Sequence, residues 1–139
     1  MDVKELINLA IDARKKAYTP YSRYKVGAAL LTSDGKIYQG CNIESAAYSV
    51  TTCAERTALL QAVFNESNSF KAICVVGGNE NETDSFKDYA PPCGVCRQYL
   101  REFCDPRDMQ VILAKSVDDY EIFTLEELLP LSFGPDHLA

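Results

Sequence analysis

The sequence predicts an α/β fold: a three-layer helix-sheet-helix sandwich with a mixed five-stranded sheet. The chain has 139 residues, which is about the size of one domain, and 47% of them are hydrophobic while 24% are charged. Segments with helical spacing of apolar residues are interleaved with short apolar runs, an order typical of layered α/β proteins. We expect residues 1–139 to form a single domain, because no repeat or linker divides them.

The first predicted element is an amphipathic helix that begins at Val3. Its apolar residues recur at intervals of three or four positions: Leu6, Ile7, Ala10, Ala13 and Ala17. Asp2 precedes the helix and is suited to cap it, and Pro20 sets the limit of its C-terminal end.

The second region predicts a β-hairpin followed by a helix. Two apolar runs, 26–31 and 37–42, flank a loop that contains Asp34-Gly35, a strong hairpin signal. Residues 52–64 are rich in Ala and Leu and contain no Gly or Pro, which predicts a helix that begins near Cys53.

The rest of the chain continues the alternation of strands and helices. We expect a buried strand at 72–76 that Gly77-Gly78 stops, an exposed polar loop at 78–90, and a helix at 94–103. The last predicted elements are strands at 110–114 and 121–124 and a short helix at 125–129, which Pro130 closes.

Charge and hydropathy exclude several classes of partner. The formal net charge is -6 and no Lys/Arg cluster stands apart from acidic residues, which argues against nucleic acid or an anionic membrane as a partner. No apolar stretch approaches the ~20 residues that a membrane span needs. Asp2 and Glu5 lie where a signal peptide would be basic, so we expect a cytoplasmic protein.

Six cysteines are unexpected in a reducing compartment, where metal ligands, nucleophiles or small core residues are more common than disulfides. Cys93 and Cys96 are three residues apart at a predicted helix start, so their sulfurs lie within ~60° on one face. Cys53 begins another predicted helix. The positive end of each helix dipole favours the thiolates that zinc binds, so one metal ion can be shared by these three cysteines.

The number of ligands separates a catalytic zinc from a structural one. A structural zinc normally has four protein ligands, whereas a catalytic zinc keeps three and leaves a position for water. Each of the other cysteines, Cys41, Cys74 and Cys104, is either a fourth ligand or a small hydrophobic residue beside an apolar run. The single histidine, His137, lies two residues from the C-terminus, which argues against a role in catalysis or metal binding.

Glu55 follows Cys53 by two residues and is a candidate for general acid/base catalysis beside an open zinc. The alternative is that it only occupies the first turn of a helix, where acidic residues are favoured. Positions two apart on a helix diverge by ~200°, so both side chains can face one site only if Cys53 lies at the irregular cap.

The residues around these candidates carry a family resemblance. Cys53-Ala54-Glu55 followed by Pro92-Cys93-Gly94-Val95-Cys96 resembles the signature of zinc-dependent deaminases. Four further segments resemble the small cytidine deaminase family, and the likeness extends over roughly Leu6 to Leu129: Tyr18-Thr19-Pro20-Tyr21-Ser22, Val26-Gly27-Ala28-Ala29-Leu30, Gly40-Cys41-Asn42-Ile43-Glu44 and Thr52-Cys53-Ala54-Glu55-Arg56-Thr57-Ala58. The resemblance implies the three-thiolate, homotetrameric branch. Its members hydrolyse cytidine and deoxycytidine to uridine and deoxyuridine with release of ammonia, a reaction of pyrimidine salvage.

The resemblance also implies roles for individual residues. It assigns one Zn²⁺ per chain to the three cysteines (Cys53, Cys93 and Cys96), proton transfer to Glu55, and contacts with the sugar hydroxyls to Asn42 and Glu44. An amide and a carboxylate suit a ribose, because the amide donates and accepts while the carboxylate accepts from two hydroxyls. The alternative for Asn42 and Glu44 is a polar strand end that faces solvent.

Further contacts follow from the same resemblance. Backbone groups near Ala54 are expected at the base, Tyr24 stands where the family commonly has Phe, and Phe133 resembles an aromatic residue that a neighbouring subunit contributes. For Tyr24 and Phe133 the alternative is core packing. Three thiolates leave the zinc site negative, and Arg56 is the candidate to offset this by hydrogen bonding to a ligand sulfur. Arg97 has either the same role or a surface salt bridge.

The sequence is also compatible with two other interpretations. The acidic loop 78–90 precedes the zinc-binding helix and is longer than its counterpart in compact family members, so it has the potential to cover the pocket and favour another nucleoside, as in blasticidin S deaminases. A structural zinc protein without catalysis is the second alternative, and it predicts a fourth protein ligand and no role for Glu55.

Overall fold

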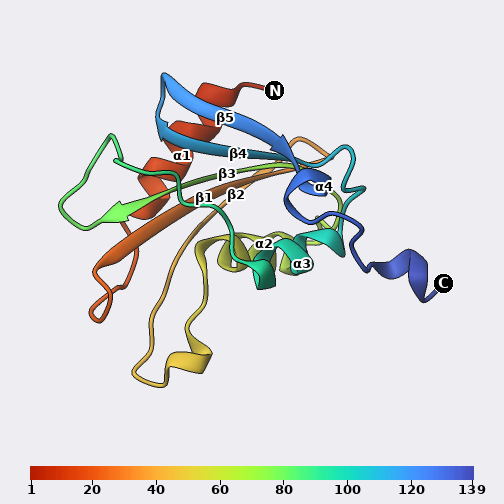
Figure 1. Cartoon of the computed structure of the whole chain (residues 1–139), viewed down its shortest axis with the longest axis horizontal. Helices are drawn as coiled ribbons and strands as arrows, with labels where there is room; N and C mark the ends of the chain where they lie inside the picture. The colour runs from red at the N-terminus through yellow and green to blue at the C-terminus, as the bar shows by residue number, and fades with distance from the viewer.

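The computed structural model describes residues 1–139 and contains one five-stranded sheet in the order β2-β1-β3-β4-β5 (Figure 1). Only β3 and β4 are parallel, so the predicted mixed sheet is confirmed. The elements are α1 (Val3–Arg14), β1 (Tyr24–Thr32), β2 (Ile37–Cys41), α2 (Ala54–Phe64), β3 (Phe70–Asn79), α3 (Gly94–Arg101), β4 (Gln110–Ser116), β5 (Asp119–Thr124) and α4 (Leu125–Leu128). Two short 3-10 turns, Tyr48–Val50 and Pro135–His137, were not predicted from the sequence.

The helices cover both faces of the sheet, which confirms the predicted α/β sandwich. Helix α1 lies on one face, and α2 and α3 lie side by side on the opposite face (Figure 1). A cluster of 11 buried residues fills the α1 side, and a second cluster of 15 fills the α2 and α3 side. None of the helices has the length and apolar character that a membrane crossing requires.

Helix α1 forms as its apolar spacing predicts. The Asp2 side chain accepts a hydrogen bond from the Glu5 backbone N–H at 3.1 Å, so it satisfies one of the unpaired donors of the first turn. Leu6, Ile7 and Ala10 are buried against the sheet. The helix ends at Arg14, which is three residues before the last predicted apolar position, Ala17.

The N-terminal ends of α2 and α3 share one geometry. Cys53 and Cys93 are the N-cap residues, with extended backbone angles of φ -70°, ψ 156° and φ -67°, ψ 166°. Neither thiol makes a capping hydrogen bond to its own helix. Both are therefore free to point away from the helix axis, and Cys53 has the irregular position that a common site with Glu55 requires.

The predicted end of the strand at 72–76 is wrong. Strand β3 does not stop at Gly77-Gly78 but runs through both glycines to Asn79, because they pair with Val26 and Lys25 of β1. A Cβ on Gly77 would lie 2.8 Å from the Ala90 Cβ, so the missing side chain makes room for a neighbouring segment rather than for a turn.

The acidic loop 78–90 is not exposed throughout, in contrast to the prediction. Phe86 is 5% exposed and packs in the α1-side core, where its N–H donates to the Lys115 carbonyl at 2.7 Å. Glu82 accepts from the Asn79 and Lys87 N–H groups. These contacts attach the loop to the sheet.

Gly40 places α2 against β2, and we expect Gly40→Ala to destabilise this contact. The new Cβ would lie 2.4 Å from the Ala54 carbonyl oxygen and 2.5 Å from the Ala58 nitrogen, which are backbone atoms that cannot rotate away. Overpacking of this kind costs about 1–3 kcal/mol in the free energy of unfolding. Denaturant titration measures the loss. The exposed Gly94, whose Cβ would meet nothing within 4 Å, provides the control in Gly94→Ala.

Candidate active site

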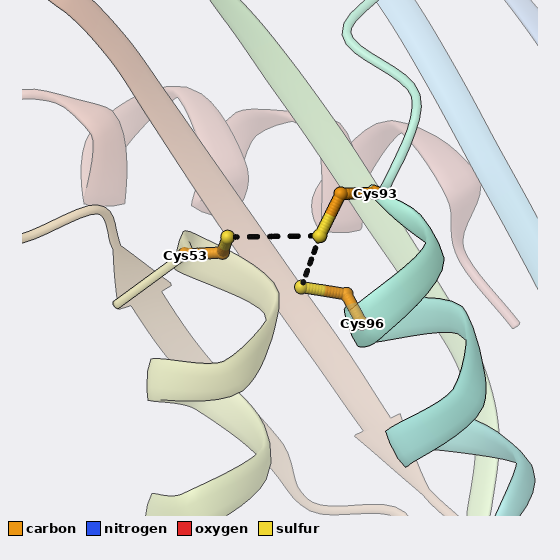
Figure 2. A group of neighbouring side chains, drawn as sticks. All are labelled: Cys53, Cys93 and Cys96. Atoms are coloured by element: carbon orange, nitrogen blue, oxygen red, sulfur yellow. Dashed lines mark hydrogen bonds between the residues drawn. The ribbon is translucent and has the colours of Figure 1, made fainter. Parts of the chain in front are cut away.

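Three cysteine sulfurs meet between the N-terminal ends of α2 and α3. Figure 2 shows Cys53 at the start of α2 and Cys93 and Cys96 on the first turn of α3, with their sulfurs directed toward one another. The Cys53 and Cys93 Sγ atoms are 3.9 Å apart, those of Cys93 and Cys96 are 3.5 Å apart, and all three lie within 4.8 Å of one another. We call this group the cysteine cluster.

The dimensions of the cysteine cluster fit zinc. A tetrahedral Zn²⁺ with Zn–S bonds of ~2.3 Å separates its sulfur ligands by about 3.8 Å. The two shorter distances in the cluster, 3.9 and 3.5 Å, match this value. No fourth Cys, His, Asp or Glu ligand atom belongs to the cluster, so the donor set is the three-ligand type that leaves a position open.

The thiols of the cluster differ in acidity. Hydrogen bonding from Cys96 and from the Arg56 guanidinium lowers the pKa of Cys53 to about 5, so this thiol ionises readily. The hydrogen bond with Cys53, together with burial and the charge of Glu55, raises the pKa of Cys96. Hydrogen bonding among the thiols thus favours one thiolate, at Cys53. A bound dication stabilises all three sulfurs as thiolates.

The two arginines that follow the ligand motifs have different partners. The Arg56 Nη2 group donates to the Cys53 Sγ at 3.5 Å and to the Thr51 carbonyl at 3.1 Å, which places positive charge beside a sulfur of the cysteine cluster. Arg97 donates to the carbonyls of Pro92 and Leu128, at 2.7 and 2.6 Å. Both interpretations of Arg97, a sulfur contact and a salt bridge, are therefore wrong; its role is to tie the segment before Cys93 to the end of α4.

Glu55 lies on the first turn of α2 and is 4% exposed. Burial raises the pKa of its carboxyl to about 7, because the charged form is poorly solvated there. The positive charge of a bound dication opposes this shift. A carboxyl group with a pKa in this region can both accept and return a proton at neutral pH, which is what general acid/base catalysis requires.

A cavity of about 250 Å³ opens in front of the cysteine cluster. Glu55 and two cysteines of the cluster line this cavity together with seven other residues. The full lining is Tyr24, Val26, Asn42, Thr51, Cys53, Ala54, Glu55, Ala90, Pro91 and Cys93. A second cavity, of about 380 Å³, shares Thr51 with the first and includes Glu44. The two together offer an apolar end beside the sulfurs and a polar end beside Glu44.

Asn42 is held rigidly at the cavity wall. Its Oδ1 accepts from the Val26 N–H, and its Nδ2 donates to the Tyr24 carbonyl, both at 2.9 Å. Each of these atoms has one further hydrogen-bonding position, since an amide oxygen accepts twice and an amide nitrogen donates twice. Asn42 is therefore a preoriented group and not a freely solvated strand end.

Glu44 is held by the turn that follows α1. Its Oε1 accepts from the backbone N–H groups of Tyr21 and Ser22, each at 3.1 Å, and its Oε2 accepts from the Ser22 hydroxyl. The Ser22 hydrogen bond lowers the pKa of Glu44, so the carboxylate stays ionised at neutral pH.

Several sequence candidates lie away from the two cavities. Phe133 lines neither of the two cavities; its ring stacks on His137 and its carbonyl accepts from Gln98. The three other cysteines are outside the cysteine cluster: Cys41, Cys74 and Cys104. Burial raises the pKa of Cys74 and of Cys104 to about 12, as expected of small core residues.

Sequence reasoning did not identify four residues of the cavity wall. Thr51 and Pro91 lie next to the motifs, and their positions beside Thr52-Cys53 and Pro92-Cys93 are a signal that could have been used. Val26 belongs to a segment that carries the family resemblance, but nothing there pointed to a place in the cavity. Ala90 had no signal, because its position depends on its packing over Gly77.

These features indicate a zinc-dependent hydrolase: three sulfurs at two helix N-termini, a buried carboxyl group and an adjoining, mainly apolar cavity. Comparisons with known proteins specify the class further. The family model of the cytidine and deoxycytidylate deaminase zinc-binding region matches residues 1–113. The chain therefore belongs to the cytidine and deoxycytidylate deaminase family, whose members are zinc hydrolases.

Individual relatives agree with this assignment. A cytidine deaminase from Sporosarcina psychrophila is 48% identical over 139 residues, which cover 100% of this chain and 96% of the relative. One from Halalkalibacterium halodurans is 46% identical over 99% of this chain and 98% of its own length. The crystal structure of cytidine deaminase from Burkholderia pseudomallei superposes with a TM-score of 0.84, at 42% identity, over 96% of this chain and 100% of that chain.

Proposed function

We propose that the chain hydrolyses cytidine and deoxycytidine to uridine and deoxyuridine with release of ammonia, a reaction of pyrimidine salvage. One observation carries the proposal: Glu55, 4% exposed, lines the same cavity as two sulfur ligands of a three-sulfur site. A buried carboxyl group loses the water that would stabilise its charge, so its position beside the sulfurs costs stability. Such a costly position is typical of a group that transfers protons in catalysis. Family membership supplies the substrate class.

The ligands of the single Zn²⁺ per chain are Cys53, Cys93 and Cys96. When bound, zinc is a Lewis acid that makes a water molecule nucleophilic at neutral pH. Glu55 takes one proton from the attacking water and gives it to N3 of the pyrimidine. As the C4–N bond breaks, Glu55 passes the second proton of that water, then on the C4 hydroxyl, to the amine, which leaves as ammonia. Arg56 donates to Cys53 and so reduces the negative charge that three thiolates place on the site.

Asn42 and Glu44 bind the sugar hydroxyls. Each retains hydrogen-bonding capacity beyond its contacts within the chain, and each lines one of the two adjoining cavities. The backbone at Ala54 and the ring of Tyr24, which line the cavity beside the cysteine cluster, border the base.

Phe133 serves the pocket of a neighbouring copy in a homotetramer. It is 56% exposed and lies outside the cavities of its own chain. The outer faces of α2 and α3 carry exposed apolar side chains that association would cover: Leu60, Phe64, Val95 and Tyr99. Light scattering on the purified protein tests this, with four times the chain mass of 15.5 kDa expected and a monomer contradicting it.

Residues 1–139 act as one cytidine deaminase-like domain in the cytoplasm. The strands of the single sheet come from residues 24–124 and have helices on both faces, and six free cysteines agree with a reducing compartment. The partner is a small nucleoside, with no nucleic acid or membrane involved.

The experiment that tests the proposal follows the change in ultraviolet absorbance as cytidine is consumed by zinc-loaded protein. We expect turnover of cytidine and deoxycytidine. Turnover of blasticidin S without turnover of cytidine would show that the substrate is that nucleoside antibiotic and not cytidine. Inactivity on all three would favour a structural zinc site and contradict the proposed enzyme.

A further inference from the structure

Arg14, the last residue of α1, is the most buried arginine of the chain, at 3% exposed, and has no role in the chemistry described above. No carboxylate lies within salt-bridge distance of it. A buried cation without a counter-ion is costly unless its donors are satisfied. The partners of this guanidinium therefore indicate what it stabilises.

The donors of Arg14 converge on the ends of two strands. Its Nε donates to the Lys25 carbonyl of β1 at 3.0 Å, and its Nη2 donates to the carbonyls of Gly78 and Asn79 of β3, at 3.1 and 2.6 Å. Its Cζ lies 4.7 Å from the ring centroid of Phe86, which comes from the acidic loop. One side chain thus joins α1, β1, β3 and that loop.

The segment that Arg14 fixes is the one that orients Asn42. Tyr24 and Val26 flank Lys25, and both line the cavity. They supply the two backbone groups that bind the Asn42 amide, the Tyr24 carbonyl and the Val26 N–H. A shift of this short segment would move the amide with it.

We propose that Arg14 is a positioning residue for substrate: its three hydrogen bonds fix the 24–26 segment against the end of β3 and thereby hold Asn42 in its sugar-binding orientation. The inference rests on the proposed function, in which Asn42 binds the sugar. The buried Phe86 ring packs on the guanidinium, so the acidic loop contributes to the same support and does not act as a free cover.

The test compares kinetic constants of Arg14→Met with those of the zinc-loaded parent. Methionine keeps an apolar stem but removes every donor. We expect KM for cytidine to rise about tenfold and kcat to change less than about twofold, because the effect is on ground-state binding and a displaced polar group loses most of its hydrogen bonding. Zinc content stays at one per chain. Arg14→Lys keeps the charge but cannot reach three carbonyls at once, so we expect it to raise KM less than Arg14→Met does. If the methionine variant does not fold, the lysine variant is measured in its place.

A control separates positioning from general stability. Leu6, also on α1, is 1% exposed and packs in the α1-side core through an apolar side chain that forms no hydrogen bond, so Leu6→Ala should lower the melting temperature at least as much while KM stays at the parental value. An equal rise of KM in Leu6→Ala, or an unchanged KM in both Arg14 variants, would overturn the inference.

A double-mutant cycle shows whether Arg14 acts through Asn42. Once Asn42→Ala has removed the amide, we expect Arg14→Met to add less than about twofold to KM, whereas independent effects would multiply. Multiplication would overturn the inference and leave the proposed function intact. An unchanged KM in Asn42→Ala alone would contradict the sugar-binding assignment itself and remove the basis of the inference.

Discussion

Glu55→Gln is expected to lower kcat for cytidine by about 10²–10⁴, the contribution typical of a positioned acid/base group. Glutamine has nearly the same size and keeps hydrogen bonding, but it cannot accept a proton from water or return one to the leaving amine. Because the side chain is 4% exposed at the start of α2, the isosteric change preserves packing. Zinc content and melting temperature should therefore match the parent.

The measurement for this variant combines an absorbance assay with metal analysis of the same sample. Glu102→Gln makes the same chemical change at an exposed position at the end of α3 and should leave kcat unaltered. Parental activity in Glu55→Gln would remove the proposed proton transfer. Loss of zinc in this variant would instead assign Glu55 a role as a ligand.

Cys93→Ala is expected to abolish both zinc binding and deamination. The variant removes one sulfur of three, and two remaining ligands from different helices do not hold a dication against a chelator. We expect about one zinc per parental chain and less than about a tenth of that in the variant after dialysis against a chelator. Activity should fall with the metal content.

The control for this variant is another cysteine. Cys74 is buried in β3 and lies outside the cysteine cluster, so Cys74→Ala should keep one zinc per chain. Full zinc content in Cys93→Ala would show that the ligand set is wrong. The comparison of the two variants distinguishes a specific ligand from any cysteine of the core.

Most elements were predicted because their signals are local. The apolar spacing and the Asp2 cap define α1, the Asp34-Gly35 turn joins β1 and β2, and the absence of Gly and Pro favours α2. Each of these signals depends on residues within one or two turns of chain.

The failures have a common physical cause, which is tertiary contact. Gly77 and Gly78 have the composition of a strand end, but a strand partner and the packing of Ala90 make small residues necessary within β3. Phe86 lies in an acidic segment that predicts exposure, and only the folded chain brings it to the α1 core. Arg14 follows Ala10 by four residues and Ile7 by seven, so its place on the apolar face of α1 was a signal of a buried arginine.

The C-terminal segment is a further case in which tertiary contacts, which the sequence does not reveal, decide the structure. A terminal position predicts fraying for His137, but Arg101 donates to the Ser132 hydroxyl and to Asp136, at 2.9 and 2.7 Å, and Gln98 donates to the Phe133 carbonyl. These contacts attach the segment to α3, the helix that carries two of the sulfur ligands. The sequence predicts the candidate site residues by type and spacing, whereas the contacts that hold them in place come from segments far apart in the chain.

In the proposed site three sulfurs alone bind zinc, and the remaining coordination position of the metal is open beside Glu55. X-ray absorption at the zinc edge of the zinc-loaded protein tests this arrangement most directly. We predict three sulfur neighbours at ~2.3 Å and one oxygen neighbour at about 2.0 Å. Four sulfur neighbours would contradict the claim, because a closed thiolate site leaves no place for the water that the reaction consumes.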